Sequence, residues 1–130
     1  TKYMEVELFR YVMHLTSVVK GHLLPELTAM DALKATLPAG TVSGAPKIRA
    51  MKRIYELETE KRGVYAGAIG YLSATGDMDF AIAIRTMILK NKTAYVQAGA
   101  GIVYDSIAQN EYQETINKAK SMTRMGELRP

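Results

Sequence analysis

LPAGTVSGAPKIRAM, residues 37–51, combines a glycine-rich loop with the start of a helix. Its two glycines, Gly40 and Gly44, permit backbone angles that a Cβ forbids. Pro46 suits the first turn of a helix, because its missing N–H removes a donor that has no partner within the helix. The remaining N–H groups at that helix start favour an anion. The stretch therefore predicts a glycine-rich loop that presents a hydroxyl group and then starts a helix whose first N–H groups favour an anion.

The composition is that of an ordinary globular protein with one domain. The 130 residues are 48% hydrophobic and 23% charged, and no cysteine is present to form a disulfide or a thiolate metal site. No apolar run approaches the roughly 18 residues of a membrane-spanning helix, and no signal peptide opens the chain, so we expect a cytoplasmic protein. The chain begins without a methionine and close to an alternating pattern, which predicts a fragment of a longer polypeptide.

The charge balance is mildly basic, with a formal net charge of +4 and an isoelectric point near 9.3. The lysines and arginines are scattered, and no basic cluster lies beside an aromatic stacking surface. A nucleic-acid-binding module is therefore only a distant alternative. The same balance suits a small anionic substrate.

Periodicity and turn residues predict an α+β fold in which an antiparallel β meander has flanking helices. Turn chemistry at 75–77 and 91–92 separates the three strands of the meander, and Asp105–Ser106 suits the cap of the last helix. The elements expected are one or two strands within 3–19, helices at 26–36, 46–60 and 107–125, and meander strands at 64–74, 78–90 and 93–103.

Several polar residues have both a structural and a functional interpretation. Arg85 lies among alanines in the expected middle strand, where a buried guanidinium needs either a carboxylate of the protein or a substrate carboxylate. The Ala98–Gly101 run lacks the third glycine and the helix start of a dinucleotide-binding fingerprint. It fits either a tight turn or N–H groups directed at a carboxylate. Tyr65 and His14 fit core positions, and a histidine can also serve in acid–base chemistry.

The last helix carries a possible carboxylate pair. Glu111 and Glu114 are three residues apart and share a face, and Lys118 follows Glu114 by four. One interpretation is a solvated Glu–Lys pair. The other is part of a site for Mg²⁺, which prefers oxygen ligands; two carboxylates rarely complete such a site, so further ligands would have to come from elsewhere.

The order of these motifs resembles the successive sequence blocks of the chorismate-binding enzymes over nearly all 130 residues. The blocks are VMHL at 12–15, PAGTVSGAPK at 38–47, GVYAGAIGY at 63–71, IRT at 84–86, QAGAGIV at 97–103 and EYQETINK at 111–118. The resemblance implies a larger fold of two β-sheets flanked by helices. This chain corresponds to its C-terminal part, and the upstream carboxylates of the family site are absent from it.

The resemblance also implies roles for individual residues and a Mg²⁺ cofactor. One group of residues would hold the carboxylates of the substrate through side chains and backbone N–H groups. A second group would act near the C4 hydroxyl that leaves the substrate. Glutamates would bind the metal, with Glu114 preferred as the direct ligand. The residues are Thr41, Tyr65, Arg85, Gly99 and Gly101 for substrate, His14, Glu111 and Lys118 for catalysis, and Glu114 with Glu111 for the metal.

Within the family, Ala39–Thr41 and Ala98–Gly101 resemble the anthranilate synthases. That subgroup is a lyase that converts chorismate and ammonia to anthranilate and pyruvate in tryptophan biosynthesis, and a partner amidotransferase supplies the ammonia from glutamine. The alternatives are an aminodeoxychorismate synthase of the folate pathway, which keeps the pyruvyl group, and a non-catalytic binding or assembly module. Because the upstream part is missing, we expect the 130-residue chain to be inactive without the remainder of its polypeptide.

Overall fold

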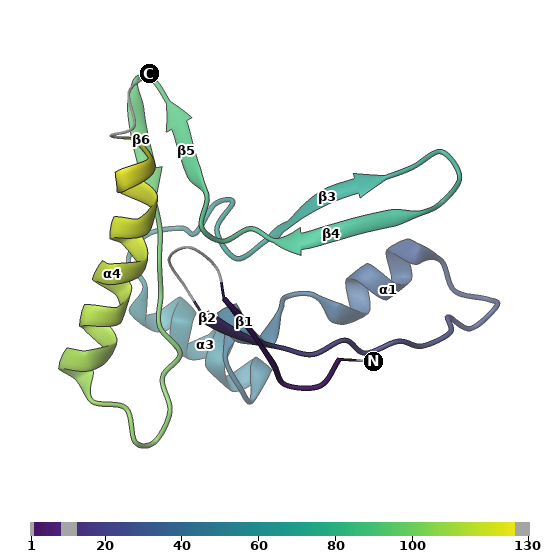
Figure 1. Cartoon of the computed structure of the whole chain (residues 1–130), viewed down its shortest axis with the longest axis horizontal. Coiled ribbons are helices and arrows are strands. Elements are labelled where there is room, and N and C mark those ends of the chain that lie inside the picture. The colour runs from purple at the N-terminus through teal and green to yellow at the C-terminus, as the bar shows by residue number, and fades with distance from the viewer. Residues whose placement is uncertain (1, 9–12, 127–130) are drawn as a thin grey trace.

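The computed structural model describes the backbone of residues 2–8 and 13–126 and the side chains of residues 2–8 and 15–123. Helices and strands are mixed along the chain, so the predicted α+β class is confirmed (Figure 1). The elements are β1 (Glu5–Leu8), β2 (Met13–Thr16), α1 (Ala29–Thr36), α2 (Gly40–Ser43), α3 (Lys47–Leu57), β3 (Ala68–Leu72), β4 (Met78–Ile82), β5 (Met87–Lys90), β6 (Thr93–Val96) and α4 (Ala108–Gly126).

The described strands pair as antiparallel hairpins, β1 with β2, β3 with β4 and β5 with β6. Both predicted turns of the meander are confirmed. In the first, the N–H of Ser73 donates to the carbonyl of Asp77 over 2.8 Å. In the second, Asn91 and Lys92 have φ angles of 51° and 62°, the left-handed pair that a two-residue hairpin turn requires.

The prediction of one continuous middle strand at 78–90 is wrong. The strand ends after Ile82 and a new strand begins at Met87, so β4 and β5 belong to separate sheets. Arg85 lies between them with φ 52°, and the N–H of Ile84 donates to the carbonyl of Ile82 over 2.8 Å. A left-handed residue turns an extended chain, and the alternation of apolar residues through this segment hides that turn.

The predicted helices all exist, with shifted ends. α1 begins at Ala29 rather than at residue 26, because Thr28 and Asp31 form a reciprocal capping box there. α3 begins after Pro46 and ends at Leu57 instead of residue 60. α4 begins at Ala108, and the hydroxyl of Ser106 accepts the N–H of Val103. None of the helices in the described part of the chain is long and apolar enough to cross a membrane.

The glycine-rich stretch contains the short helix α2, which the sequence did not predict. Gly44 ends it with φ 78°, and a Cβ at this position would lie 2.9 Å from the Cβ of Ala50. The prediction that Gly44 needs glycine geometry is therefore confirmed. Gly40 does not use this freedom, because it is a helical residue, and a Cβ built on it would have none of the described residues within 4 Å outside its own helix and chain neighbours.

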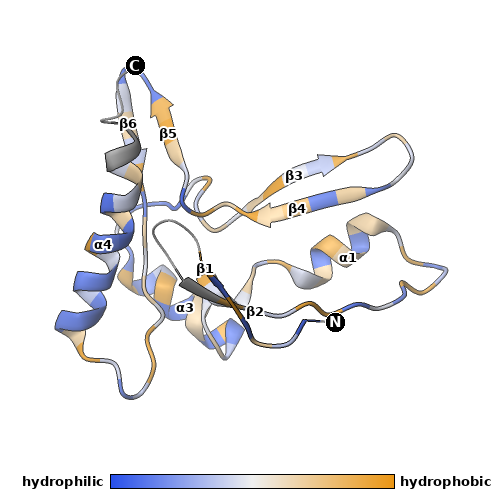
Figure 2. Ribbon diagram, in the orientation of Figure 1, coloured by the Kyte–Doolittle hydropathy of each residue, from blue (hydrophilic) through white to orange (hydrophobic). Residues whose placement is uncertain are grey.

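Most of the chain's hydrophobic surface lies outside any core. Among the described residues, only Ala83 and Met122 are buried hydrophobics, whereas Tyr55 is 89% and Leu57 78% exposed. The accessible surface is 11358 Å², against about 6,800 Å² for a compact monomer of this mass. Figure 2 shows hydrophobic residues distributed over separate elements rather than gathered at one centre. The arrangement in Figure 1 is correspondingly open, with the β3–β4 hairpin and α4 pointing in different directions.

Candidate functional site

The turn that carries Tyr65 is hydrogen-bonded to the segment that follows β4. The N–H of Ala66 donates to the carbonyl of Ala83 over 3.0 Å, and the N–H of Ala83 donates to the carbonyl of Gly67 over 2.9 Å. Ala83 is 1% exposed and lies two residues before Arg85. These bonds hold the chain segments of Tyr65 and Arg85 side by side, although 20 positions separate the two residues in the sequence.

The glycine run after β6 also lies close to this turn. A Cβ built on Gly99 would lie 3.0 Å from the hydroxyl oxygen of Tyr65. The carbonyl of Gly99 in turn accepts a hydrogen bond of 3.1 Å from Nζ of Lys118. Lys118 is also ion-paired with Glu114, one turn earlier on α4. The structure therefore brings together four residues that the sequence singled out, Tyr65, Gly99, Lys118 and Glu114.

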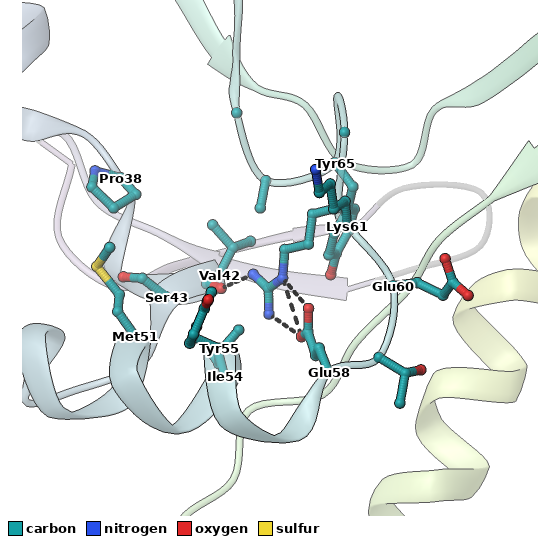
Figure 3. Close-up of a pocket in the computed structure, with 15 residues that line it drawn as sticks. Pro38, Val42, Ser43, Met51, Ile54, Tyr55, Glu58, Glu60, Lys61 and Tyr65 are labelled. Carbon is teal, nitrogen blue, oxygen red and sulfur yellow. Dashed lines mark hydrogen bonds and ion pairs between the residues drawn. The ribbon is translucent and has the colours of Figure 1, made fainter.

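An ion pair that the sequence analysis missed lies next to Tyr65, and its bonds to Glu58 are among the dashed lines in Figure 3. Arg62 binds Glu58 through two nitrogens, with Nε 2.8 Å from Oε2 and Nη2 2.5 Å from Oε1. Its Nη1 donates to the carbonyl of Val42 in α2 over 2.7 Å. The guanidinium carbon lies 5.5 Å from the centre of the Tyr65 ring, within the range of a cation–π contact. Glu and Arg four residues apart are the signal that could have indicated this pair.

Arg62 and Glu58 each shift the pKa of the other in the direction that favours the charged form. Hydrogen bonding to Arg62 lowers the pKa of Glu58 below its ordinary value, and hydrogen bonding to Glu58 raises the pKa of Arg62. Both groups are therefore charged at neutral pH. Both residues line a pocket of about 630 Å³ between α2, α3 and the Tyr65 turn. The buried residue Ser43 of α2 also lines this pocket.

The remaining predicted residues have less defined surroundings. Thr41 is exposed on α2, immediately before Val42, whose carbonyl Arg62 holds. Arg85 is an exposed residue of a turn, so its predicted place in a buried strand is wrong. Gly101 has no atom of the described residues within 4 Å of a built Cβ. The backbone of His14 pairs with Glu7 in the β1–β2 hairpin, and its side chain lies outside the described residues.

The described residues alone do not fit a complete magnesium site. Glu111 and Glu114 offer the oxygen donors that Mg²⁺ prefers. Glu114, however, is paired with Lys118. Across residues 2–8 and 13–126 as described, no three or more His, Cys, Asp or Glu residues come together as a metal site would need. A site that uses these two glutamates would need further oxygen ligands beyond those that the described residues bring together.

Comparisons with known proteins give a consistent result. A model of a family described as chorismate binding enzyme matches residues 1–124. The chain is 68% identical over 125 residues to anthranilate synthase component 1 of Lactococcus lactis subsp. lactis (strain IL1403), covering 96% of this chain and 27% of that protein. It is 54% identical over 126 residues to the protein of that name from Aquifex aeolicus (strain VF5), covering 97% and 26%.

A solved structure is also similar. The crystal structure of anthranilate synthase component I from Streptococcus pneumoniae TIGR4 is 96% identical in sequence and superimposes with a TM-score of 0.90. The match covers 95% of this chain and 28% of that one. The chain thus spans about a quarter of the length of the curated relatives that it matches.

Proposed function

This chain belongs to the family of chorismate binding enzymes, and we propose that it supplies part of the catalytic site of an anthranilate synthase component I. The similarity of nearly the whole chain to proteins of that name supports the proposal. The proposed reaction is that of a lyase acting in tryptophan biosynthesis. Chorismate is aminated at C2 with loss of the C4 hydroxyl as water, and elimination of pyruvate then gives anthranilate.

The observation that carries the proposal is the closeness of the Tyr65 hydroxyl to Gly99, together with the hydrogen bond from Lys118 to the carbonyl of Gly99. These residues come from three distant segments, and the Tyr65 turn is bonded to the segment of Arg85. A phenolic hydroxyl, backbone amides and two cations suit an anionic substrate, since charge-assisted hydrogen bonds bind carboxylates strongly. Chorismate carries two carboxylates.

The roles proposed for single residues follow the family motifs. Tyr65 and Arg85 hold the enolpyruvyl carboxylate together with N–H groups near Gly99 and Gly101. A substrate carboxylate accepts a hydrogen bond from the hydroxyl of Thr41. His14 lies near the departing C4 hydroxyl, and Lys118 and Glu111 lie close to the reacting ring.

The remaining requirements of the reaction are met outside this chain. Mg²⁺, when bound, would orient the ring carboxylate. Glu114 and Glu111 would contribute to its site together with carboxylates of the remaining polypeptide. The ammonia would come from a glutamine amidotransferase, since the relatives' name, component 1, implies a second component. A cytoplasmic location fits these soluble reactants and stays a prediction.

The test uses the full-length chain, meaning this segment joined to the remaining three quarters that its relatives possess. The purified full-length chain is incubated with chorismate, ammonium and Mg²⁺, and anthranilate fluorescence and released pyruvate are measured together. We expect equal amounts of the two products. An aminated product that keeps its pyruvyl group would instead indicate the aminodeoxychorismate reaction. If chorismate binds but no product forms, the chain would be assigned as a non-catalytic binding module.

A further inference from the structure

Arg62 contacts three separate parts of the candidate site, and none of the roles proposed above includes it. We propose that Arg62 is a positioning residue, held by Glu58, that fixes α2 with Thr41 against the turn with Tyr65. The inference rests on the proposed function, because Thr41 and Tyr65 are the substrate-binding residues of that proposal.

The hydrogen bond to Val42 is the first part of the argument. α2 has only four residues, so its last carbonyls have few partners within the helix. Arg62 Nη1 donates to the carbonyl of Val42 over 2.7 Å, and this bond is partly buried. It ties the peptide unit between Val42 and Ser43, one residue after Thr41, to a residue 20 positions beyond Val42. The direction in which α2 presents Thr41 therefore depends on Arg62.

The contact with Tyr65 is the second part. The guanidinium lies over the tyrosine ring at 5.5 Å, and the turn bond from Tyr65 N–H to the carbonyl of Arg62, 3.1 Å, keeps the two residues together. Both carboxylate oxygens of Glu58 accept hydrogen bonds from the same guanidinium, and these bonds fix its plane. One rigid planar group thus fixes the position of the Val42 carbonyl in α2 and the orientation of the Tyr65 ring.

The chemistry of arginine is the third part. Its planar fork can bind a carboxylate through two nitrogens, donate a third bond and stack on a ring at the same time. A lysine ammonium is a point charge and can reproduce only some of these contacts. The Arg62 side chain is 25% exposed, so its contacts are less screened than those of surface pairs.

The experiment measures steady-state kinetics of the full-length chain with Arg62→Lys, Arg62→Met and Glu58→Gln. The matched control is Arg53→Met, which breaks the Arg53–Glu56 pair on α3, whose side chains are 63% and 54% exposed. We expect kcat/KM for chorismate to fall about ten-fold in both Arg62 variants, in keeping with a sub-ångström displacement of binding groups. Glu58→Gln should give a smaller fall, and Arg53→Met should stay within about two-fold of the parent.

A second arm separates positioning from stability. Arg62→Met is combined with Thr41→Ala and Tyr65→Phe, and thermal unfolding is measured for every variant. We expect Arg62→Met to lower kcat/KM by less than about two-fold in that background, while its effect on the unfolding midpoint is unchanged. The proposal would be overturned if Arg62→Met still lowered kcat/KM about ten-fold in that background. Normal kinetics of both Arg62 variants in the parent would also overturn it. The parent's product analysis reports separately on the proposed function, so its failure is distinguishable from failure of the Arg62 inference.

Discussion

Replacing Gly99 by alanine in the full-length chain tests whether the glycine run makes room for the Tyr65 hydroxyl. The new Cβ would lie 3.0 Å from Tyr65 Oη, whereas ordinary contacts begin at 3.4 Å. The tyrosine or the glycine run must therefore move by a few tenths of an ångström. A displacement of 1 Å in a catalytic site costs roughly 100-fold, so we expect kcat/KM for chorismate to fall about five-fold.

The matched control for this variant is Gly101→Ala, which keeps the backbone N–H that is the proposed substrate contact at this position. It introduces the same methyl group two residues away, where no atom of the described residues lies within 4 Å. We expect a change of kcat/KM of about two-fold or less. Both variants should unfold at temperatures close to that of the parent, which is measured by circular dichroism before the kinetics are compared.

A double-mutant cycle identifies the atom responsible. In a Tyr65→Phe background the oxygen that the new Cβ meets is absent, so Gly99→Ala should lower kcat/KM by less than about two-fold. Initial rates of anthranilate fluorescence with ammonium as the nitrogen donor give the four values of the cycle. A five-fold loss that persists without the hydroxyl, or a loss at Gly101 as large as that at Gly99, would refute the reasoning.

Three further predictions concern the whole segment and its charges. The isolated 130-residue chain should make no detectable anthranilate and should bind a hydrophobic dye, because it exposes 11358 Å² and its described residues bring no three metal-binding side chains together; steady turnover by a sample shown pure by mass spectrometry would contradict this. Arg85→Lys in the full-length chain should lower kcat/KM about ten-fold or more with little change in unfolding temperature, because an ammonium cannot bind a carboxylate in the same bidentate way; unchanged chorismate kinetics would remove Arg85 from the site. The pKa of Glu58 is lowered in the folded state, so its stabilising effect is present above its ordinary pKa of 4.5 and lost as the pH falls through the folded value. Urea unfolding of the parent and of Glu58→Gln should therefore differ most near pH 7 and converge below pH 4.5; a difference that grows on acidification would show that the sign is wrong.

Local features of the sequence predicted the elements of the fold well. The hairpin turns at 73–77 and 91–92, and the long C-terminal helix, follow from turn chemistry and periodicity, which depend on neighbouring residues. The start of α1 was misplaced because the capping box of Thr28 and Asp31 was not recognised. The break at Arg85 was missed because alternating residues on both sides imitate one strand, and a single left-handed residue leaves no periodic signal.

The motifs in the sequence determined the family and the residue types of the candidate site, because each motif is a short contiguous stretch. Only the tertiary structure decided which of these stretches meet. The bonds from Arg62 to Val42 and from Lys118 to Gly99 span 20 and 19 positions, and the contact of Tyr65 with Gly99 spans a longer separation. Such contacts depend on how hairpins and helices pack, and nothing in the spacing of neighbouring residues encodes them. The sequence likewise showed no sign of how much apolar surface stays exposed, since burial is a property of the packed chain rather than of its composition.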